Sequence, residues 1–134
     1  MEMATATVKV EQISGSASKG NARGHEVVMD RPEAKGGTNK GMMGGEAMLS
    51  GLGGCFMSNL LAAAKARNIE LKNASVDIEG DMADAPSRFS AIRMMVSAQC
   101  DPREELDKLV RIAERGCISA NTLRKAVDLS IRIT

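Results

Sequence analysis

The sequence predicts an α+β protein in which antiparallel sheets pack on a buried central helix. Segments with the alternation and β-branched residues of strands occur near both ends and in the middle of the chain, and segments with helical periodicity lie between them. One helical segment, residues 46–68, is apolar on nearly every face, which places it in the interior. The chain of 134 residues suits a single domain, 1–134, and a dimer with intertwined sheets would cover such a helix from both sides.

The N-terminal part predicts a hairpin. Residues 5–13 alternate and are rich in β-branched side chains, and residues 25–29 read as their partner strand. The polar, glycine-rich connection at 14–24 is expected to be mobile. Residues 30–45 follow neither period and predict a long loop, which in a small domain is usually functional or crosses to a partner chain.

The central helix, EAMLSGLGGCFMSNLLAAAKARN, contains three glycines within four residues. Each glycine costs a helix interior about 1 kcal/mol relative to alanine, so the cluster at Gly51, Gly53 and Gly54 needs a reason. Positions without side chains allow another segment to approach the helix closely. Asn68 is expected to end the helix in a left-handed conformation.

The second half of the chain is predicted to form two strands, at 74–80 and 89–99, and then a long helix. A short helical segment at 118–126 and a final strand at 127–134 follow. The long helix between them is expected to start with Asp101 as N-cap and Pro102 at its first position, and to end at Gly116.

Composition disfavours several classes of function. The net charge is +1, no run of basic residues occurs, and two phenylalanines are the only aromatic residues, so nucleic acid is not the expected partner. The first residues lack the basic start and apolar stretch of a secretory signal, and no segment reads as the roughly 20 apolar residues that span a bilayer. We therefore expect a cytoplasmic protein without a membrane partner.

The glycine-rich loop does not predict a nucleotide site. Gly36 and Gly41 have P-loop separation, but Met42 and Met43 stand where Lys and Ser or Thr are required. The surrounding methionines predict either gap-filling core or a deformable apolar wall for a ligand: Met42, Met43, Met48 and Met57. His25 is expected at the surface of a strand, and a single histidine without a CxxC pair predicts no metal site.

Three cysteines are the candidates for chemistry. In a compartment that keeps thiols reduced, any bridge among them is expected to be transient and catalytic. Cys55 lies mid-helix among small residues, and Cys117 starts a helix, where N-terminal amides could lower its pKa. The alternative to a chemical role for both is that they are buried and act only as small apolar residues of the core. This is also our interpretation of Cys100.

Two segments resemble the OsmC/Ohr family. Residues 46–80, EAMLSGLGGCFMSNLLAAAKARNIELKNASVDIEG, are similar to its core signature, in which a helix carrying GGC precedes a V-x-I/V-E-G strand. Residues 113–127, AERGCISANTLRKAV, are similar to its second cysteine segment, with Ile118 in place of the family proline. The resemblance extends from about Gly36 to Thr134, and its two cysteines are 62 residues apart.

The resemblance implies an intertwined α+β homodimer with active sites at the subunit interface. It further implies a thiol peroxidase that reduces organic hydroperoxides or hydrogen peroxide without metal or organic cofactor. Cys55 would be the peroxidatic residue and become a sulfenic acid, and Cys117 would capture it as a disulfide. A dithiol reductant, of lipoyl type in family members that have been assigned one, would reopen the bridge.

Family peroxidases also use a glutamate and an arginine. The glutamate usually precedes the cysteine by ten residues, a position held here by Gly45, and the nearest carboxylate is Glu46. On a regular helix nine residues turn through about 900°, so Glu46 faces Cys55 only if the helix begins after Glu46 or bends near Gly51. For the arginine we select Arg23, with Arg31 as the other candidate.

Two other functions fit the same residues. The first is a non-catalytic dimeric OsmC-fold protein that binds an apolar small molecule at a methionine-lined interface. The second is a cysteine redox sensor, which requires a partner protein that the sequence does not identify. Thiols that stay inert to peroxide, together with a ligand that co-purifies, would favour the binding protein.

Overall fold

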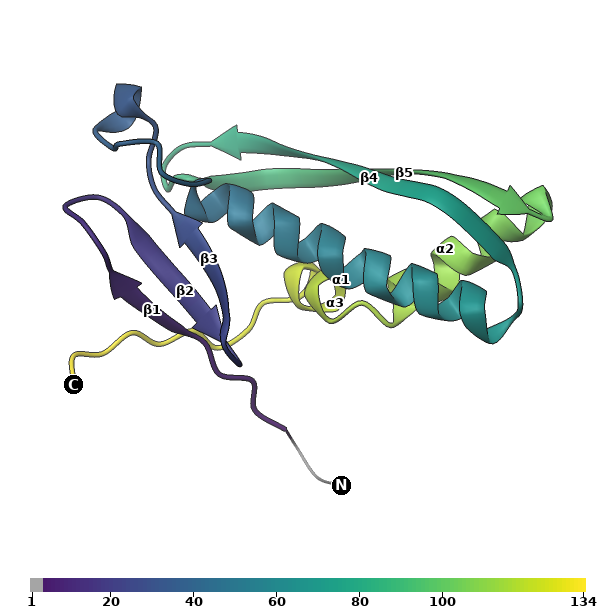
Figure 1. Cartoon of the computed structure of the whole chain (residues 1–134). Coiled ribbons are helices and arrows are strands. Elements are labelled where there is room, and N and C mark those ends of the chain that lie inside the picture. The colour runs from purple at the N-terminus through teal and green to yellow at the C-terminus, as the bar shows by residue number, and fades with distance from the viewer. Residues whose placement is uncertain (1–3) are drawn as a thin grey trace. The chain divides into compact units, whose positions relative to one another are not determined.

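The computed structural model describes residues 4–134, which form two compact units, one ending at Met48 and one running from Leu49 to Thr134 (Figure 1). The first unit carries an antiparallel sheet, and the second combines an antiparallel strand pair with helices. This confirms the predicted α+β class. The assignment of residues 1–134 to one domain stays a prediction.

The sheet of the first unit has three antiparallel strands in sequence order: β1 (Lys9–Gln12), β2 (Ser18–Ala22) and β3 (His25–Met29). The predicted pairing of the first strand with β3 was wrong, because β2 lies between them, within the segment expected to be mobile. A two-residue turn, Arg23-Gly24, joins β2 to β3 with φ of 54° and 86°. Such a turn matches the twist of paired strands, and it lets β2 form despite its glycine and polar residues.

The predicted loop after β3 is confirmed, and it is organised by one buried carboxylate. Asp30 accepts hydrogen bonds from the backbone N–H groups of Arg31 at 2.7 Å, Thr38 at 3.2 Å and Lys40 at 3.2 Å. The Thr38 hydroxyl also donates to it at 2.6 Å and contributes most to holding the pKa of Asp30 well below its usual range. A short 3-10 helix, η1 (Glu33–Lys35), forms part of this loop.

Helix α1 (Gly44–Ala66) begins two residues earlier than predicted and, as predicted, is followed by a left-handed Asn68 with φ of 53°. With 23 residues it is long and apolar enough to cross a membrane by those two criteria, so our expectation that no segment would qualify was wrong. Its buried residues form part of the hydrophobic core: Leu52, Phe56, Leu60, Ala63 and Ala64.

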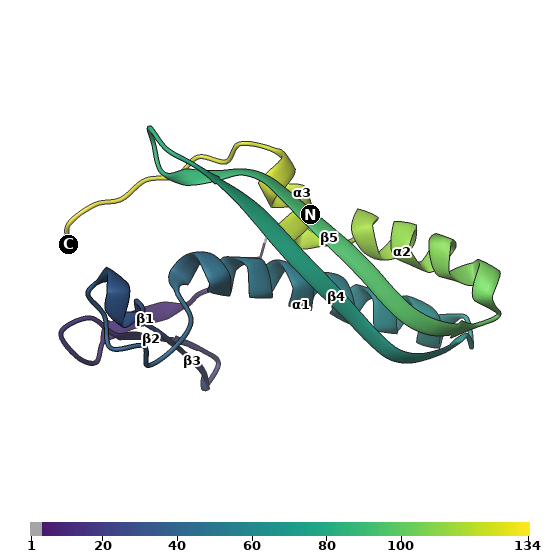
Figure 2. The same ribbon diagram turned by 90° about the horizontal axis from the view of Figure 1, so that it is seen from above.

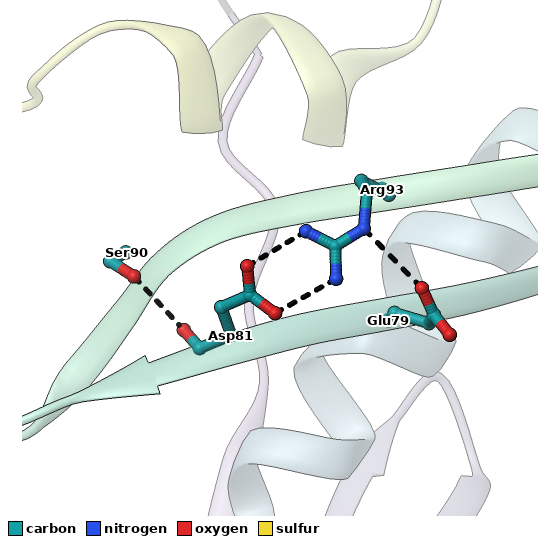
Figure 3. A network of polar contacts seen from close by, with 4 residues as sticks. All are labelled: Glu79, Asp81, Ser90 and Arg93. Carbon is teal, nitrogen blue, oxygen red and sulfur yellow. Dashed lines mark hydrogen bonds and ion pairs between the residues drawn. The ribbon is translucent and has the colours of Figure 1, made fainter.

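Strands β4 (Glu70–Ala83) and β5 (Arg88–Asp101) form a long antiparallel ribbon that runs beside α1 (Figure 2). Both strands are longer than predicted. Along most of the ribbon, half-buried apolar residues alternate with exposed polar ones, so that one face packs on the core and the other faces solvent. On the exposed face, Arg93 donates two hydrogen bonds of 2.8 Å to Asp81 and contacts Glu79 at 3.3 Å (Figure 3). These contacts tie β5 to β4.

The helix start predicted at Asp101 was wrong. Asp101 is the last residue of β5 and pairs with Glu70, so the sheet ladder takes the position that local sequence assigned to an N-cap. A 3-10 turn, η2 (Arg103–Glu105), then leads into α2 (Leu106–Arg115), which ends at Gly116 as predicted. Helix α3 (Ile118–Arg124) confirms the short helical segment.

The final strand predicted at residues 127–134 is also wrong for this chain. The segment has no regular secondary structure and is exposed throughout, since no strand of residues 4–134 pairs with it. An alternating sequence becomes a strand only when a neighbouring edge accepts its hydrogen bonds.

One glycine of α1 is explained by a close approach. A Cβ atom built on Gly53 would lie 2.6 Å from Cδ1 of Ile78 on β4, whereas at Gly51 and Gly54 it would meet nothing within 4 Å. The absence of a side chain at Gly53 therefore allows α1 to pack directly on the ribbon.

We predict that Gly53→Ala changes the free energy of unfolding by less than about 1 kcal/mol, because the new methyl group displaces the terminal Cδ1 of Ile78 and this strain offsets the helix propensity of alanine. Ile78→Val removes the contacted Cδ1 atom. In that background the same alanine should be neutral or stabilise by up to about 1 kcal/mol through its helix propensity. Urea unfolding of the four proteins of this cycle measures the coupling, and purely additive effects would contradict the steric explanation.

Candidate active site

The first candidate thiol, Cys55, lies in the middle of α1. It follows Gly54 and precedes Phe56, which is only 2% exposed. Cys55 is itself half-buried and packs against the core cluster. The neighbouring glycines leave space beside the thiol on the helix surface, since a Cβ at Gly54 would meet nothing within 4 Å.

The second candidate thiol, Cys117, is completely buried between α2 and α3. It is the N-cap of α3, with an extended backbone, and its sulfur accepts a hydrogen bond from the Ala120 N–H at 3.5 Å. Gly116 ends α2 immediately before it. The tight connection between the two helices thus fixes the position of the Cys117 sulfur.

The structure places these two thiols near enough for each to shift the pKa of the other. The pKa of Cys55 lies below its ordinary value, chiefly because the backbone N–H of Ser119 donates to its sulfur. The Cys117 thiol, the Ser119 hydroxyl and the Ile118 N–H lower it further, against an opposing effect of burial. Burial raises the pKa of Cys117, and the neighbouring Cys55 raises it further. These opposite shifts make Cys55 the more acidic of the two thiols.

The prediction that N-terminal amides would lower the pKa of Cys117 was wrong in direction. The amides are present, but those of Ser119 and Ile118 stabilise the Cys55 thiolate. The Ala120 and Ser119 N–H groups also favour the Cys117 thiolate, but they do not offset the burial of this residue. Sequence reasoning also missed Ser119. Its position, two residues after a helix-starting cysteine, was the available signal, but only the fold shows which sulfur its donors reach.

The third cysteine does not join this pair. Cys100 is half-buried near the end of β5, packs against the core and donates to the Pro102 carbonyl at 3.3 Å. This agrees with its interpretation as a structural residue.

The other predicted site residues have local roles in the first unit. Glu46 lies in the first turn of α1, which begins before it, and its carboxylate accepts the Met43 N–H at 2.8 Å. Arg23 occupies the left-handed turn between β2 and β3, and Arg31 is an exposed residue of the loop organised by Asp30. A part for Glu46 or Arg23 in the chemistry of Cys55 stays a prediction.

Within residues 4–134, no group of three or more His, Cys, Asp or Glu side chains could hold a metal ion. His25 starts β3 and is exposed, as predicted. Of the four methionines considered, Met57 packs against the core and Met43 lines a concavity of about 610 Å³ in the first unit. Met42 and Met48 are exposed.

Comparison with known protein families gives a match that covers the segments carrying Cys55 and Cys117. The family described as OsmC-like protein matches residues 37–132, which include both thiols. The chain belongs to the OsmC-like family. The predicted resemblance is thereby confirmed. None of the curated proteins compared with the sequence matches it.

Solved structures show the same fold as this OsmC-like chain. An OsmC-like protein from Mycoplasma pneumoniae is 18% identical, with a TM-score of 0.79 over 90% of this chain and 88% of that one. The organic hydroperoxide resistance protein OhrB of Bacillus subtilis is 23% identical, with a TM-score of 0.58 over 92% and 93%. An organic hydroperoxide resistance protein from Elizabethkingia anophelis is 20% identical, with a TM-score of 0.61 over 90% of this chain and 88% of that one. At these identities the comparisons establish the fold.

We predict that Cys55 of this OsmC-like protein has a lower pKa than an ordinary thiol and that Cys117 has a higher one. Iodoacetamide alkylation, followed by peptide mass spectrometry across pH, should place the midpoint for Cys55 below that of Cys117. Ser119→Ala should move the Cys55 midpoint upward, because it removes the hydroxyl donor and leaves the backbone N–H in place. Equal midpoints for both cysteines, or a lower one for Cys117, would contradict the described hydrogen bonding.

Proposed function

We propose that this chain is a thiol-dependent peroxidase that reduces organic hydroperoxides or hydrogen peroxide. The observation that carries the proposal is the contact between a half-buried thiol of lowered pKa, Cys55, and a buried thiol of raised pKa, Cys117. A peroxidatic cysteine must be a thiolate that substrate can reach, and a resolving cysteine must stay nearby until it is needed. Several neighbours in structure are titled organic hydroperoxide resistance proteins, which supports the same function.

The proposed reaction has two steps within the protein. The Cys55 thiolate attacks the terminal oxygen of ROOH, the O–O bond breaks, and the leaving alkoxide takes a proton to give ROH and a Cys55 sulfenic acid. The Cys117 sulfur then attacks the Cys55 sulfur, and the hydroxyl leaves with the Cys117 proton as water. A dithiol reductant, possessing the two electrons required, returns the disulfide to two thiols and becomes a disulfide itself. None of these steps requires a metal or an organic cofactor.

The proximity of the two thiols favours disulfide formation over irreversible oxidation of the Cys55 sulfenic acid. A sulfenic acid that meets a thiol at once forms a disulfide, whereas one that waits can be oxidised irreversibly. Since Cys117 is fully buried, bulk oxidant reaches it less readily than Cys55. Such a cycle suits the cytoplasm, where a dithiol pool keeps thiols reduced. We therefore propose a cytoplasmic location.

We predict that one equivalent of cumene hydroperoxide rapidly converts the reduced protein to a Cys55–Cys117 disulfide, seen as a 2 Da loss by intact mass spectrometry (about two hydrogens) with peptide mapping. Cys117→Ser should accumulate sulfenic and overoxidised Cys55, and Cys55→Ser should abolish peroxide turnover. Cys100→Ser is the matched control and should behave as the wild type, because its thiol contacts the Pro102 carbonyl instead of the pair.

Inert thiols would overturn the peroxidase and favour the second candidate, a protein that binds an apolar small molecule. The concavity in the first unit supports that alternative, since its lining includes Val10, Met29 and Met43. A ligand retained through purification and released on denaturation, together with unreactive Cys55, would be the evidence for it.

We also propose that the protein acts as a homodimer. The C-terminal segment supports this, because its alternating apolar side chains are each at least 64% exposed: Val127, Leu129, Ile131 and Ile133. Apolar exposure of this kind on a strand-like segment is expected where a second chain supplies the pairing edge. The exposed side of α1 supports it as well, since Met48 and Leu61 are 44% and 47% exposed beside the open positions of Gly51 and Gly54.

We predict a two-chain mass by light scattering for the wild type and a loss of dimer for Ile131→Lys combined with Ile133→Lys. The two lysines would place charge on the apolar face of the segment, which disfavours its pairing with a second chain. Ser130→Lys combined with Arg132→Lys leaves the apolar side unchanged while placing lysines on the alternate side, and this control should remain dimeric. A wild type that stays monomeric at micromolar concentration would exclude the proposed homodimer.

A further inference from the structure

The end of α2 contains a buried carbonyl group that the backbone leaves without its usual donor. The N–H of Gly116 donates to Ile112 at 3.3 Å, and the N–H of Cys117 donates to Glu114 at 3.3 Å, so neither reaches the oxygen of Ala113. Ala113 is completely buried. A buried carbonyl at a helix end needs a partner from elsewhere in the fold.

That partner is a side chain of α1. The amide Nδ2 of Asn59 donates to the Ala113 oxygen at 3.4 Å. The same nitrogen lies 3.5 Å from the position that a Cβ atom would take on Gly116, so Asn59 sits directly against the end of α2. Asn59 is half-buried in this contact.

The position of this bond relates it to the two thiols. Asn59 follows Cys55 by four residues, which places both on the same side of α1, one turn apart. Ala113 lies in the last turn of α2 and precedes Cys117 by four residues. One hydrogen bond therefore joins the helical turn after Cys55 to the helical turn before Cys117.

Other polar contacts stiffen the connection itself. The Asn121 amide donates to the Arg115 carbonyl at 3.0 Å, and Arg124 forms an ion pair with Glu114. Both contacts tie α3 to α2. The bond from Asn59 differs because it ties α1 to this α2–α3 corner.

We propose that Asn59 is a positioning residue that sets the approach of the Cys117 sulfur to Cys55, an inference that rests on the proposed function of the pair. A disulfide forms without strain only within narrow limits of Cα separation, about 4.4–6.8 Å. A shift of the α2 end along α1 moves Cys117 relative to Cys55. The step affected is the attack of the Cys117 thiol on the oxidised Cys55 sulfur, with release of water.

The test compares disulfide formation with and without the Asn59 amide. Purified wild-type protein and Asn59→Ala are equilibrated with mixtures of reduced and oxidised dithiothreitol, and the Cys55–Cys117 disulfide is quantified by mass spectrometry after acid quench. We expect Asn59→Ala to lower the equilibrium constant for the disulfide about tenfold or more, because a bond between sulfurs displaced from disulfide geometry is strained and more easily reduced. After cumene hydroperoxide, the variant should also leave more Cys55 as a dimedone-trapped sulfenic acid.

Matched variants separate positioning from stability. Val96→Ala removes apolar contact from β5 to the same core and keeps the Asn59 amide, so it should lower Tm while leaving the disulfide equilibrium unchanged. Asn59→Gln keeps an amide donor and should lie between wild type and Asn59→Ala. If Asn59→Ala does not fold, Asn59→Ser provides the same comparison with a side chain too short to reach Ala113.

The outcomes distinguish this inference from the proposed function, because dithiothreitol equilibrium needs no peroxide. Folded Asn59 variants with the wild-type equilibrium constant would overturn the positioning role. A shifted constant in a protein that cumene hydroperoxide does not oxidise would support the role and reject the peroxidase. A wild type that forms no Cys55–Cys117 disulfide in oxidised dithiothreitol would overturn both.

Discussion

The apolar packing of α1 against α2 and α3 is the interaction on which the second unit depends. Phe56 and Leu60 of α1, Leu109 of α2 and the thiol of Cys117 are the largest fully buried side chains in the part of the chain described. Full burial of one such hydrocarbon side chain contributes about 1.5–3 kcal/mol. Since Cys55 directly precedes Phe56, the same packing that forms the core holds its sulfur against the start of α3.

The asymmetry between the two thiols follows from how that packing distributes donors and solvent. Burial disfavours a thiolate in either place, but Cys55 receives several hydrogen bonds from α3, and Cys117 receives its main one from Ala120. Two chemically identical thiols near each other therefore have different pKa values. A pair whose environments separate its pKa values in this way divides into a nucleophile and a proton-bearing partner.

Stability and the proposed chemistry share the same residues in this unit. Ala113 and Cys117 belong to the core, while the Asn59 bond that satisfies the Ala113 carbonyl also bears on the distance between the thiols. Gly53 has a comparable double effect, because its contact with Ile78 sets how closely α1 lies on the ribbon. Changes that loosen α1 are thus expected to act on folding and on thiol chemistry together.

The sequence by itself determined the α+β class, the left-handed end of the central helix at Asn68, the close of α2 at Gly116 and the two cysteine segments that identify the family. These features follow from local pattern and backbone preference. The tertiary structure alone decided that β2 separates β1 from β3, that residues 127–134 find no pairing strand within their own chain and that the α3 donors serve Cys55. Strand pairing and the direction of a pKa shift depend on neighbours distant in sequence, so local pattern could not reveal them.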